Sequence, residues 1–245
     1  MLRFLIVLSL LIPSFGYAYE CNEEIDMLAR KYETKITCNI QENQFGDRVT
    51  YKRADQNLIN QFSSSLNNFF KLYNREIIKN HIDKMILVGE LRFNGSIVGG
   101  LSNGNIIFIS IDDYRSSAYR ESIYSFVLNH EFSSNILRGA SYYKRISWRS
   151  ISMLYDESYD FLMKNVNNFY FSRQTSENLL RDGLLVNYSA TNHENDFNLY
   201  AEKLFTRDSE FLRYKNRYPK VAKKLEMLKQ IYREAGYTGK FPDET

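Results

Sequence analysis

The chain has 245 residues, with 32 Lys and Arg against 29 Asp and Glu, and carries a formal net charge of +3. This near balance excludes the strongly basic surface on which electrostatic nucleic-acid binding depends. Aromatic residues make up 15% of the chain, enough for an extensive core and amphipathic surface, or for a groove that binds peptide or glycan.

The first eighteen residues have the pattern of a secretory signal peptide. Arg3 supplies the positive start, an apolar run extends from Phe4 to Ile12, and Gly16 and Ala18 are the small residues of a cleavage site. The apolar run is too short to span a bilayer. We therefore predict cleavage after Ala18 and an exported mature protein, periplasmic or secreted, with no membrane span.

The two cysteines, Cys21 and Cys38, frame a small N-terminal element. A pair in an oxidising compartment is more often bridged than free, so we expect a disulfide, with two unpaired thiols as the alternative. The bridge would join a helix in EEIDMLARKYE to a short strand in KITCNI. We expect this element to cover residues 19–50 and the main domain to cover residues 51–245, because no repeat or linker divides the rest of the chain.

A long helix and a small sheet are predicted next. Residues 54–81 carry apolar side chains at helical spacing. From Lys84 the period changes, and segments separated by Asn-Gly and Gly-Asn steps predict short strands joined by tight turns: MILVGELRF, GSIVGGLS and NIIFISI. We expect a small antiparallel sheet, with the strand Asn105–Ile111 beside a groove.

Helical spacing returns over residues 117–141, where His130 and Ser134 share the apolar face. Further helices are predicted in DESYDFLMKNV, from about Glu194 to Phe205, and in YPKVAKKLEMLKQIYREAG, with the loop RDGLLVNYSATN before the second of them. The order of elements is helix, small sheet, helix and then further helices, which favours an α+β fold.

The stretch LNHEFSSNILRG carries the strongest chemical pattern. In His-Glu-x-x-His, two histidines one helical turn apart hold zinc and the glutamate activates the metal-bound water. His130 and Glu131 fit the first two positions, but Ser134 stands at the second histidine, and a neutral hydroxyl is a poor zinc ligand. A histidine on an apolar helix face is also often a hydrogen-bonded core residue.

HEFSS, followed about sixty residues later by NYSATNHENDFNLYAEKLF, resembles the gluzincin metallopeptidases of the anthrax lethal factor type over roughly residues 105–205. The resemblance implies a zincin-like fold: a small antiparallel sheet packed on an active-site helix, followed by a mostly helical C-terminal half. It also implies a peptide or protein substrate whose backbone pairs with an edge strand in the place of NIIFISI.

The same resemblance assigns roles to individual residues. His130 matches the first zinc ligand, Glu131 the general base, and Tyr188 the tyrosine that stabilises the oxyanion. An ungapped alignment from Tyr188 puts the third ligand on Asn195, and a shift of one residue gives Glu194 or Asp196, each about 100° from Asn195 around the helix. We take Glu194 as the ligand, with Asp196 as the alternative.

Two further residues complete the expected site. Glu202, two turns beyond Glu194, would be an outer-sphere carboxylate. His193 is either an exposed histidine at a helix start or a replacement for the missing imidazole, which with His130 and Glu194 would make an open catalytic zinc site.

Two functions follow. With Zn²⁺ bound, the protein would be an exported peptidase that hydrolyses peptide bonds with metal-activated water. The alternative is a catalytically inactive pseudopeptidase that binds peptides or proteins, in which Ser133, Ser134 and Asn135 form a hydrogen-bonded polar patch. A chance match of HEFSS in an unrelated helical domain is the third interpretation.

Overall fold

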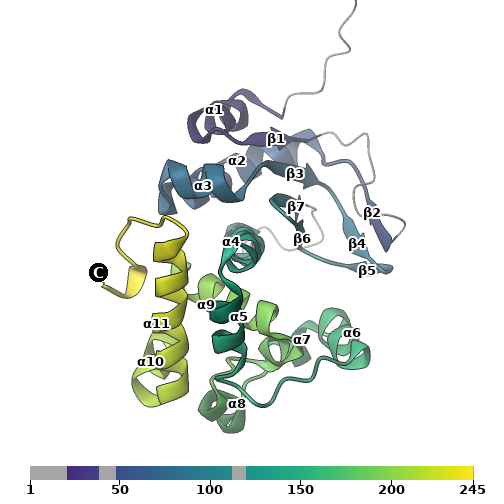
Figure 1. Ribbon diagram of the computed structural model, residues 1–245. Coiled ribbons are helices and arrows are strands. Elements are labelled where there is room, and N and C mark those ends of the chain that lie inside the picture. The colour runs from purple at the N-terminus through teal and green to yellow at the C-terminus, as the bar shows by residue number, and fades with distance from the viewer. Residues whose placement is uncertain (1–20, 39–47, 112–119, 245) are drawn as a thin grey trace, which may run out of the picture.

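The computed structural model describes residues 21–38, 48–111 and 120–244. The expected leader, residues 1–18, lies outside them. Figure 1 shows strands and helices in the N-terminal part and only helices in the C-terminal part, with α4 (Arg120–Gly139) between the two. This arrangement confirms the α+β class.

The N-terminal element is held by the predicted bridge, because Cys21 and Cys38 form a disulfide. Helix α1 (Glu23–Tyr32) begins at Asn22, whose side chain accepts the backbone N–H of Ile25. Closing a loop of this length contributes about 3 kcal/mol to stability. Strand β1 (Lys35–Thr37) pairs with β3 and α1 packs on α2 and α3, so this element shares the main core.

The larger sheet is mixed. Its order is β1-β3-β7-β6, with β3 (Lys84–Val88) and β7 (Ile106–Ser110) parallel and β6 (Gly100–Asn103) antiparallel to β7. The prediction of a purely antiparallel sheet was therefore wrong. After Val88 the chain leaves this sheet and forms a hairpin of two strands, β4 (Leu91–Phe93) and β5 (Ser96–Ile97). The hairpin pairs with β2 (Val49–Tyr51) to make a second, three-stranded sheet.

Within the described residues, β6 and not β7 stands at an edge of the larger sheet, with β1 at the opposite edge. β7 lies between β3 and β6, and its residues Ile107–Ile109 are fully buried, so the prediction that residues 105–111 lie beside a groove was wrong. A continuous apolar run is typical of a strand covered on both faces. The backbone N–H of Ser110 donates to Gly99 O, so these two residues are a hydrogen-bonded pair, and every second residue from Gly99 onward along β6 bonds to β7. It follows that Gly100 and Ser102 direct their backbone N–H and C=O groups away from β7.

The single helix predicted for residues 54–81 is two helices, α2 (Gln56–Leu72) and α3 (Arg75–His81). Tyr73 between them is extended, with φ −122° and ψ 147°. Its ring packs on Phe132 and Phe205, and its hydroxyl donates to Asn129 Oδ1 at 2.6 Å. The break lets one aromatic side chain join α2 to α4 and α9.

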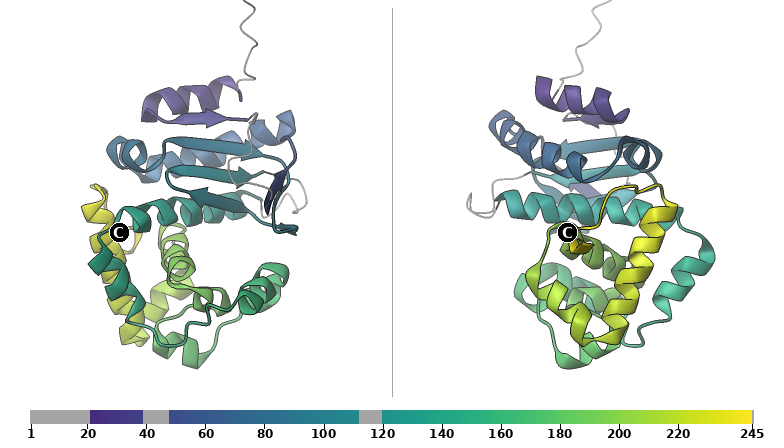
Figure 2. Two further views of the ribbon diagram at one scale, coloured as in Figure 1. Left: turned by 45° about the vertical axis from the view of Figure 1, so that its right-hand side comes forward. Right: turned by 90° about the vertical axis from the view of Figure 1, so that its left-hand side faces the viewer.

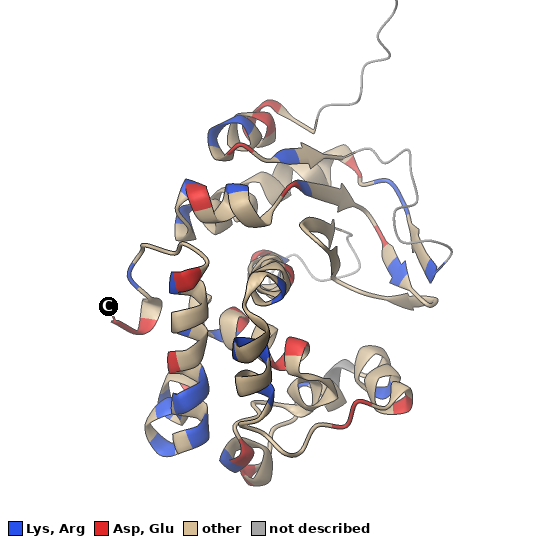
Figure 3. Ribbon diagram, in the orientation of Figure 1, with Lys and Arg blue, Asp and Glu red and all other residues tan. Residues whose placement is uncertain are grey.

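The C-terminal part packs against the face of α4 opposite the sheet (Figure 2). Its elements are α5 (Tyr142–Arg149), α6 (Tyr159–Asn167), α7 (Phe169–Ser172), α8 (Glu177–Asp182), η3 (Asn187–Thr191), α9 (His193–Phe205), α10 (Ser209–Arg217), α11 (Pro219–Glu234) and η4 (Pro242–Glu244). Basic residues are concentrated on α10 and the start of α11 (Figure 3). Many of them are ion-paired: Lys215 with Asp243, Arg217 with Glu177 and Lys220 with Asp182.

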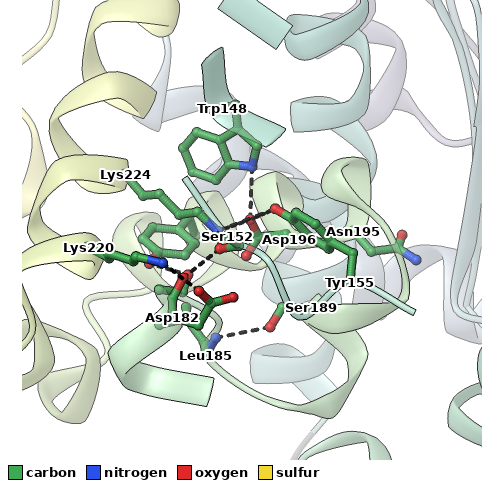
Figure 4. Close-up of polar contacts among 12 residues, drawn as sticks. Trp148, Ser152, Tyr155, Asp182, Leu185, Ser189, Asn195, Asp196, Lys220 and Lys224 are labelled. Atoms are coloured by element: carbon green, nitrogen blue, oxygen red, sulfur yellow. Dashed lines mark hydrogen bonds and ion pairs between the residues drawn. The ribbon is translucent and has the colours of Figure 1, made fainter. Parts of the chain in front are cut away.

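A fully buried ion pair lies inside these helices (Figure 4). Lys224 Nζ is 2.6 Å from Asp196 Oδ2, and both side chains are 0% exposed. The same carboxylate oxygen accepts the Trp148 indole N–H at 2.9 Å and the Tyr155 hydroxyl at 2.7 Å. Lys224 also donates to Ser152 Oγ. The pair therefore connects α5, the loop after it, α9 and α11.

Candidate functional site

The candidate site is a polar seam between α4 and α9. These helices are antiparallel, so each four-residue advance along one matches a four-residue retreat along the other. Three contacts follow that register. They are His130 with Glu202, Ser134 with Asn198, and Arg138 with Glu194, and we call these six residues the α4–α9 seam.

At one end of the seam, a carboxylate lies between two basic groups. Glu202 Oε2 is 3.7 Å from His130 Nδ1, and Glu202 Oε1 accepts from Arg173 Nη1 at 2.7 Å. Burial raises the pKa of Glu202, but the charges of Arg173 and His130 outweigh it and hold that pKa at about 2. Burial lowers the pKa of His130, but the negative charges of Glu202 and Glu131 raise it by more than burial lowers it. The pKa of His130 therefore lies above its ordinary value.

In the middle of the seam, an amide bridges two hydroxyls. Asn198 Nδ2 donates to Ser134 Oγ at 2.7 Å, and Asn198 Oδ1 lies 2.7 Å from Ser133 Oγ. All three side chains are at most 2% exposed. Asn135 does not join them, because its amide donates to His81 O at 2.8 Å on another side of α4. The predicted polar patch is therefore made by Ser133, Ser134 and Asn198.

At the far end, Glu194 pairs with Arg138 at 2.7 Å. We expected the start of this helix to lie beside His130. That expectation was wrong, because the helices run antiparallel and His130 faces Glu202 near the end of α9. The eight residues from Glu194 to Glu202 correspond to about 12 Å along the helix axis.

The two remaining ligand candidates are also placed elsewhere. Asp196 forms the buried pair with Lys224, and on α9 it points about 200° away from Asn198, which faces α4. His193 is the first residue of α9, at the Arg138 end of the seam, and its Nδ1 is buried without a hydrogen-bond partner among the described residues. The fold thus brings neither of them, nor Glu194, to His130.

Glu131 and Tyr188 do lie close to His130. A Cβ atom on Gly100 of β6 would stand 2.6 Å from Glu131 Cγ, so this carboxylate packs directly under the edge strand. Burial raises the pKa of Glu131 above its ordinary value. The Tyr188 ring centroid is 5.8 Å from that of His130. Burial and the Glu131 charge raise the pKa of Tyr188, so its phenol stays neutral.

The donor set of the seam does not fit a catalytic zinc centre, which needs three strong protein ligands around one point. The two side chains facing each other beside His130 are a serine hydroxyl and a carboxamide, already hydrogen-bonded together. The nearby Glu202 carboxylate is held by Arg173, whose positive charge opposes a dication. In residues 21–38, 48–111 and 120–244, no three His, Cys, Asp or Glu side chains form a metal-binding group.

Three residues of the site were not foreseen from the sequence: Arg138, Asn198 and Arg173. Arg138 continues the spacing of four from His130 and Ser134 on α4. Asn198 had a usable signal, because Glu194, Asn198 and Glu202 are spaced by four and share one helix face. The alignment from Tyr188 instead predicts the third ligand among residues 194–196. Arg173 had none, since it follows α7 and reaches Glu202 only through the tertiary fold.

Glu202→Gln is expected to lower the pKa of His130, because it removes the neighbouring carboxylate that stabilises the imidazolium. NMR titration of the His130 ring protons measures this pKa, and Glu194→Gln at the far end of the seam is the matched control.

The raised pKa of His130 stabilises the folded protein at pH values below about 6.5, and this contribution is lost as the pH rises through the pKa of the folded state. The Glu202 contribution is present above 4.5 and is lost as pH falls toward about 2. An unchanged His130 pKa in Glu202→Gln would contradict the assignment.

Comparisons with known proteins address the fold. No family model matches the chain, and no curated protein matches it in sequence. The structure is similar to that of a "putative zinc-binding metallo-peptidase" from Bacteroides caccae, with a TM-score of 0.57 and 11% sequence identity over 90% of this chain and 87% of that chain. This likeness confirms a metallopeptidase-like α+β fold. None of the helices in the described part of the chain has the length and apolar character needed to cross a bilayer.

Proposed function

We propose that this protein is an exported, non-hydrolytic peptide-binding protein built on a metallopeptidase fold. The observation that carries the proposal is the hydrogen bond between Asn198 and Ser134, at 2.7 Å. One turn along α4 from His130, a second imidazole would stand at Ser134. The nearest position facing it on α9 is Asn198, where a carboxylate ligand would stand. The two positions at which a zinc peptidase would have metal ligands are thus occupied by a carboxamide and a hydroxyl that are hydrogen-bonded to each other.

The rest of the seam supports the same proposal. A buried polar group is stable only when it is hydrogen-bonded, and Ser133, Ser134 and Asn198 satisfy one another without any external ligand. Arg173 supplies a fixed positive charge to Glu202, so the carboxylate is neutralised without a metal. Glu202 also lies within ion-pair distance of His130, 3.7 Å from its Nδ1. The site is therefore a self-contained hydrogen-bonded core with only part of the peptidase chemistry left.

The free edge of β6 is the proposed recognition element. In the described sheet no strand pairs with β6 on the side away from β7, and the backbone groups of Gly100 and Ser102 point to that side. An extended peptide that adds to this edge gains main-chain hydrogen bonds, while neighbouring side chains select its sequence. Glu131 packs against Gly100 of this edge, and Tyr188 packs beside His130, the neighbour of Glu131 on α4. These three side chains would form that selective surface.

Export rests on two observations. The first eighteen residues have the pattern of a signal peptide. The disulfide between Cys21 and Cys38 is typical of proteins that reside in an oxidising compartment. We therefore place the mature protein in the periplasm or outside the cell.

The proposal is tested with a randomised peptide display library on the purified protein. Peptides selected by wild type should bind Ser102→Ala with similar affinity and lose binding to Ser102→Pro. Proline removes the outward N–H of an edge strand without removing a bond to β7. Ser102→Ala is the matched control, because it removes the hydroxyl but keeps the N–H.

Zinc-dependent hydrolysis is the competing outcome of the same experiment. The selected peptides are incubated with protein and excess Zn²⁺ and then examined by mass spectrometry. We expect intact peptides. Cleavage that Glu131→Gln abolishes would establish a working peptidase and overturn the proposal, and so would equal peptide binding by Ser102→Pro.

A further inference from the structure

A cavity lies at the end of the α4–α9 seam beyond Glu202. Its volume is about 380 Å³, within the range of pockets that bind small molecules. It is enclosed by the second half of α2, the first turns of α4 and the chain just after α9. Leu72, Phe126 and Phe205 supply its apolar wall. None of the residues that line it belongs to β6 or to the proposed selective surface, so this cavity is separate from the peptide-binding edge.

Opposite charges line the same cavity. Arg207 comes from the turn after α9, and Glu121 comes from the first turn of α4. Glu121 Oε1 is oriented by Asn68 Nδ2 at 3.4 Å, across from α2. Arg207 is exposed, and its guanidinium makes no ion pair or side-chain hydrogen bond within the described residues. A cation and an anion thus line one largely apolar cavity, and the cation has no ion-pair partner in the described part of the chain.

The backbone at Arg207 is unusual. Its φ is 57°, in the left-handed region that residues other than glycine, asparagine and aspartate rarely adopt. The position ends α9: the backbone N–H of Arg207 donates to Leu204 O and that of Asp208 to Lys203 O, both at 3.0 Å, which is how a left-handed residue commonly terminates a helix. Glycine or asparagine is the residue that this backbone accepts most readily.

We propose that this cavity binds a free apolar amino acid such as leucine or phenylalanine. The ligand's carboxylate would pair with Arg207, its ammonium group with Glu121, and its side chain would pack between Phe126 and Phe205. Charge complementarity selects this class. A fatty acid has no positive group for Glu121, which would face either the ligand's own carboxylate or its apolar chain. A phosphate would be attracted by the guanidinium of Arg207 but repelled by the carboxylate of Glu121.

Isothermal titration of the purified protein with L-phenylalanine and L-leucine is the direct test. We expect saturable binding of one equivalent of each. N-acetyl-L-phenylalanine lacks the ammonium charge and L-phenylalaninamide lacks the carboxylate. Each should bind at least about tenfold more weakly, because each loses one charge-assisted hydrogen bond.

Variants locate the binding site. Arg207→Asn removes the guanidinium and tolerates the left-handed backbone, so it should fold normally and weaken L-phenylalanine binding at least about tenfold. Arg213→Asn, on the exposed surface of α10, is the matched control and should bind as wild type does. Glu121→Gln must weaken the same ligand from the other side of the cavity, which keeps the test decisive if Arg207→Asn folds poorly. The absence of saturable binding at millimolar concentration, or binding that both Arg207→Asn and Glu121→Gln leave unchanged, would overturn the proposal.

Discussion

Ser134→His combined with Asn198→Glu is expected to raise zinc affinity by at least about a thousandfold over wild type. The two substitutions place an imidazole four residues after His130 and a carboxylate on α9 directly opposite it. Together with His130 they supply the three N/O ligands of an open zinc site. Glu202 already lies at His130 Nδ1, where such a carboxylate orients a ligating ring.

Each single substitution should behave differently from the pair. Ser134→His alone inserts a ring at a position that is 2% exposed and breaks the bond to Asn198, so we expect an overpacking cost of about 1–3 kcal/mol. Asn198→Glu alone buries a carboxylate without a partner. Zinc is expected to restore stability only in the double variant, which a thermal melt with and without Zn²⁺ would show.

Isothermal titration with Zn²⁺ measures the affinity, and Glu194→Gln in the double variant is the control. Because Glu194 is held by Arg138 at the other end of the seam, its removal should leave zinc binding unchanged. Tight binding of one zinc ion by wild type would contradict the ligand assignment. A double variant that gained nothing would show that the register of the seam is not the register of a zinc site.

The second large effect is expected from Lys224→Met, which should lower the free energy of unfolding by about 3–5 kcal/mol. Lys224 and Asp196 are both 0% exposed, and removal of the ammonium group leaves a buried carboxylate without its counter-charge. Trp148 and Tyr155 would still donate to Asp196, but two neutral donors do not replace a charge. Urea unfolding followed by circular dichroism measures the loss.

Two comparisons isolate the ion pair. Lys223→Met removes the exposed neighbouring lysine and should change stability by less than about 0.5 kcal/mol. Lys224→Met with Asp196→Leu removes both charges and should recover much of the loss, because a buried pair is often replaceable by apolar groups. If Lys224→Met were as stable as Lys223→Met, the pair would not contribute as the geometry indicates.

The pH dependence gives an independent check of the same variant. Burial raises the pKa of Asp196 even with Lys224 present, and loss of Lys224 should raise it further. A carboxyl whose pKa is higher in the folded state binds protons more tightly there, so the stability of Lys224→Met should fall as pH rises above 3.8. Its deficit relative to wild type should therefore be smaller near pH 4 than near pH 7.

Local patterns were sufficient for several features. Helices α1, α4, α9 and α11 were predicted from apolar spacing, because each has one face against the core. The bridge between Cys21 and Cys38 was predicted because a cysteine pair in an oxidising compartment is more often bridged than free, and the structure confirms it. The presence of Ser134 in place of the second histidine of the motif was also visible, since the two histidines of the motif lie on the same helix and their spacing is local.

Long-range features were not predictable in the same way. Apolar strands separated by turn residues predicted consecutive hairpins, yet the larger sheet pairs β3 with β7 in parallel across the intervening β4, β5 and β6. The turns predicted at Asn94–Gly95 and Asn103–Gly104 are confirmed. A tight turn, however, determines only that the two strands flanking it lie next to each other. Which strand finally occupies the sheet edge depends on the burial of all of them.

The sequence by itself determined that His130, Glu131 and Ser134 share one stretch of helix and that this chain departs from the zinc motif. Only the tertiary structure decided that Asn198 is the partner of Ser134, that Glu202 faces His130, and that Glu194 faces Arg138. The physical reason is that adjacent residues on a helix point about 100° apart, so an error of one or a few residues in relating α9 to α4 changes every contact across the seam. That relation is set by packing between segments more than fifty residues apart, which no local spacing records.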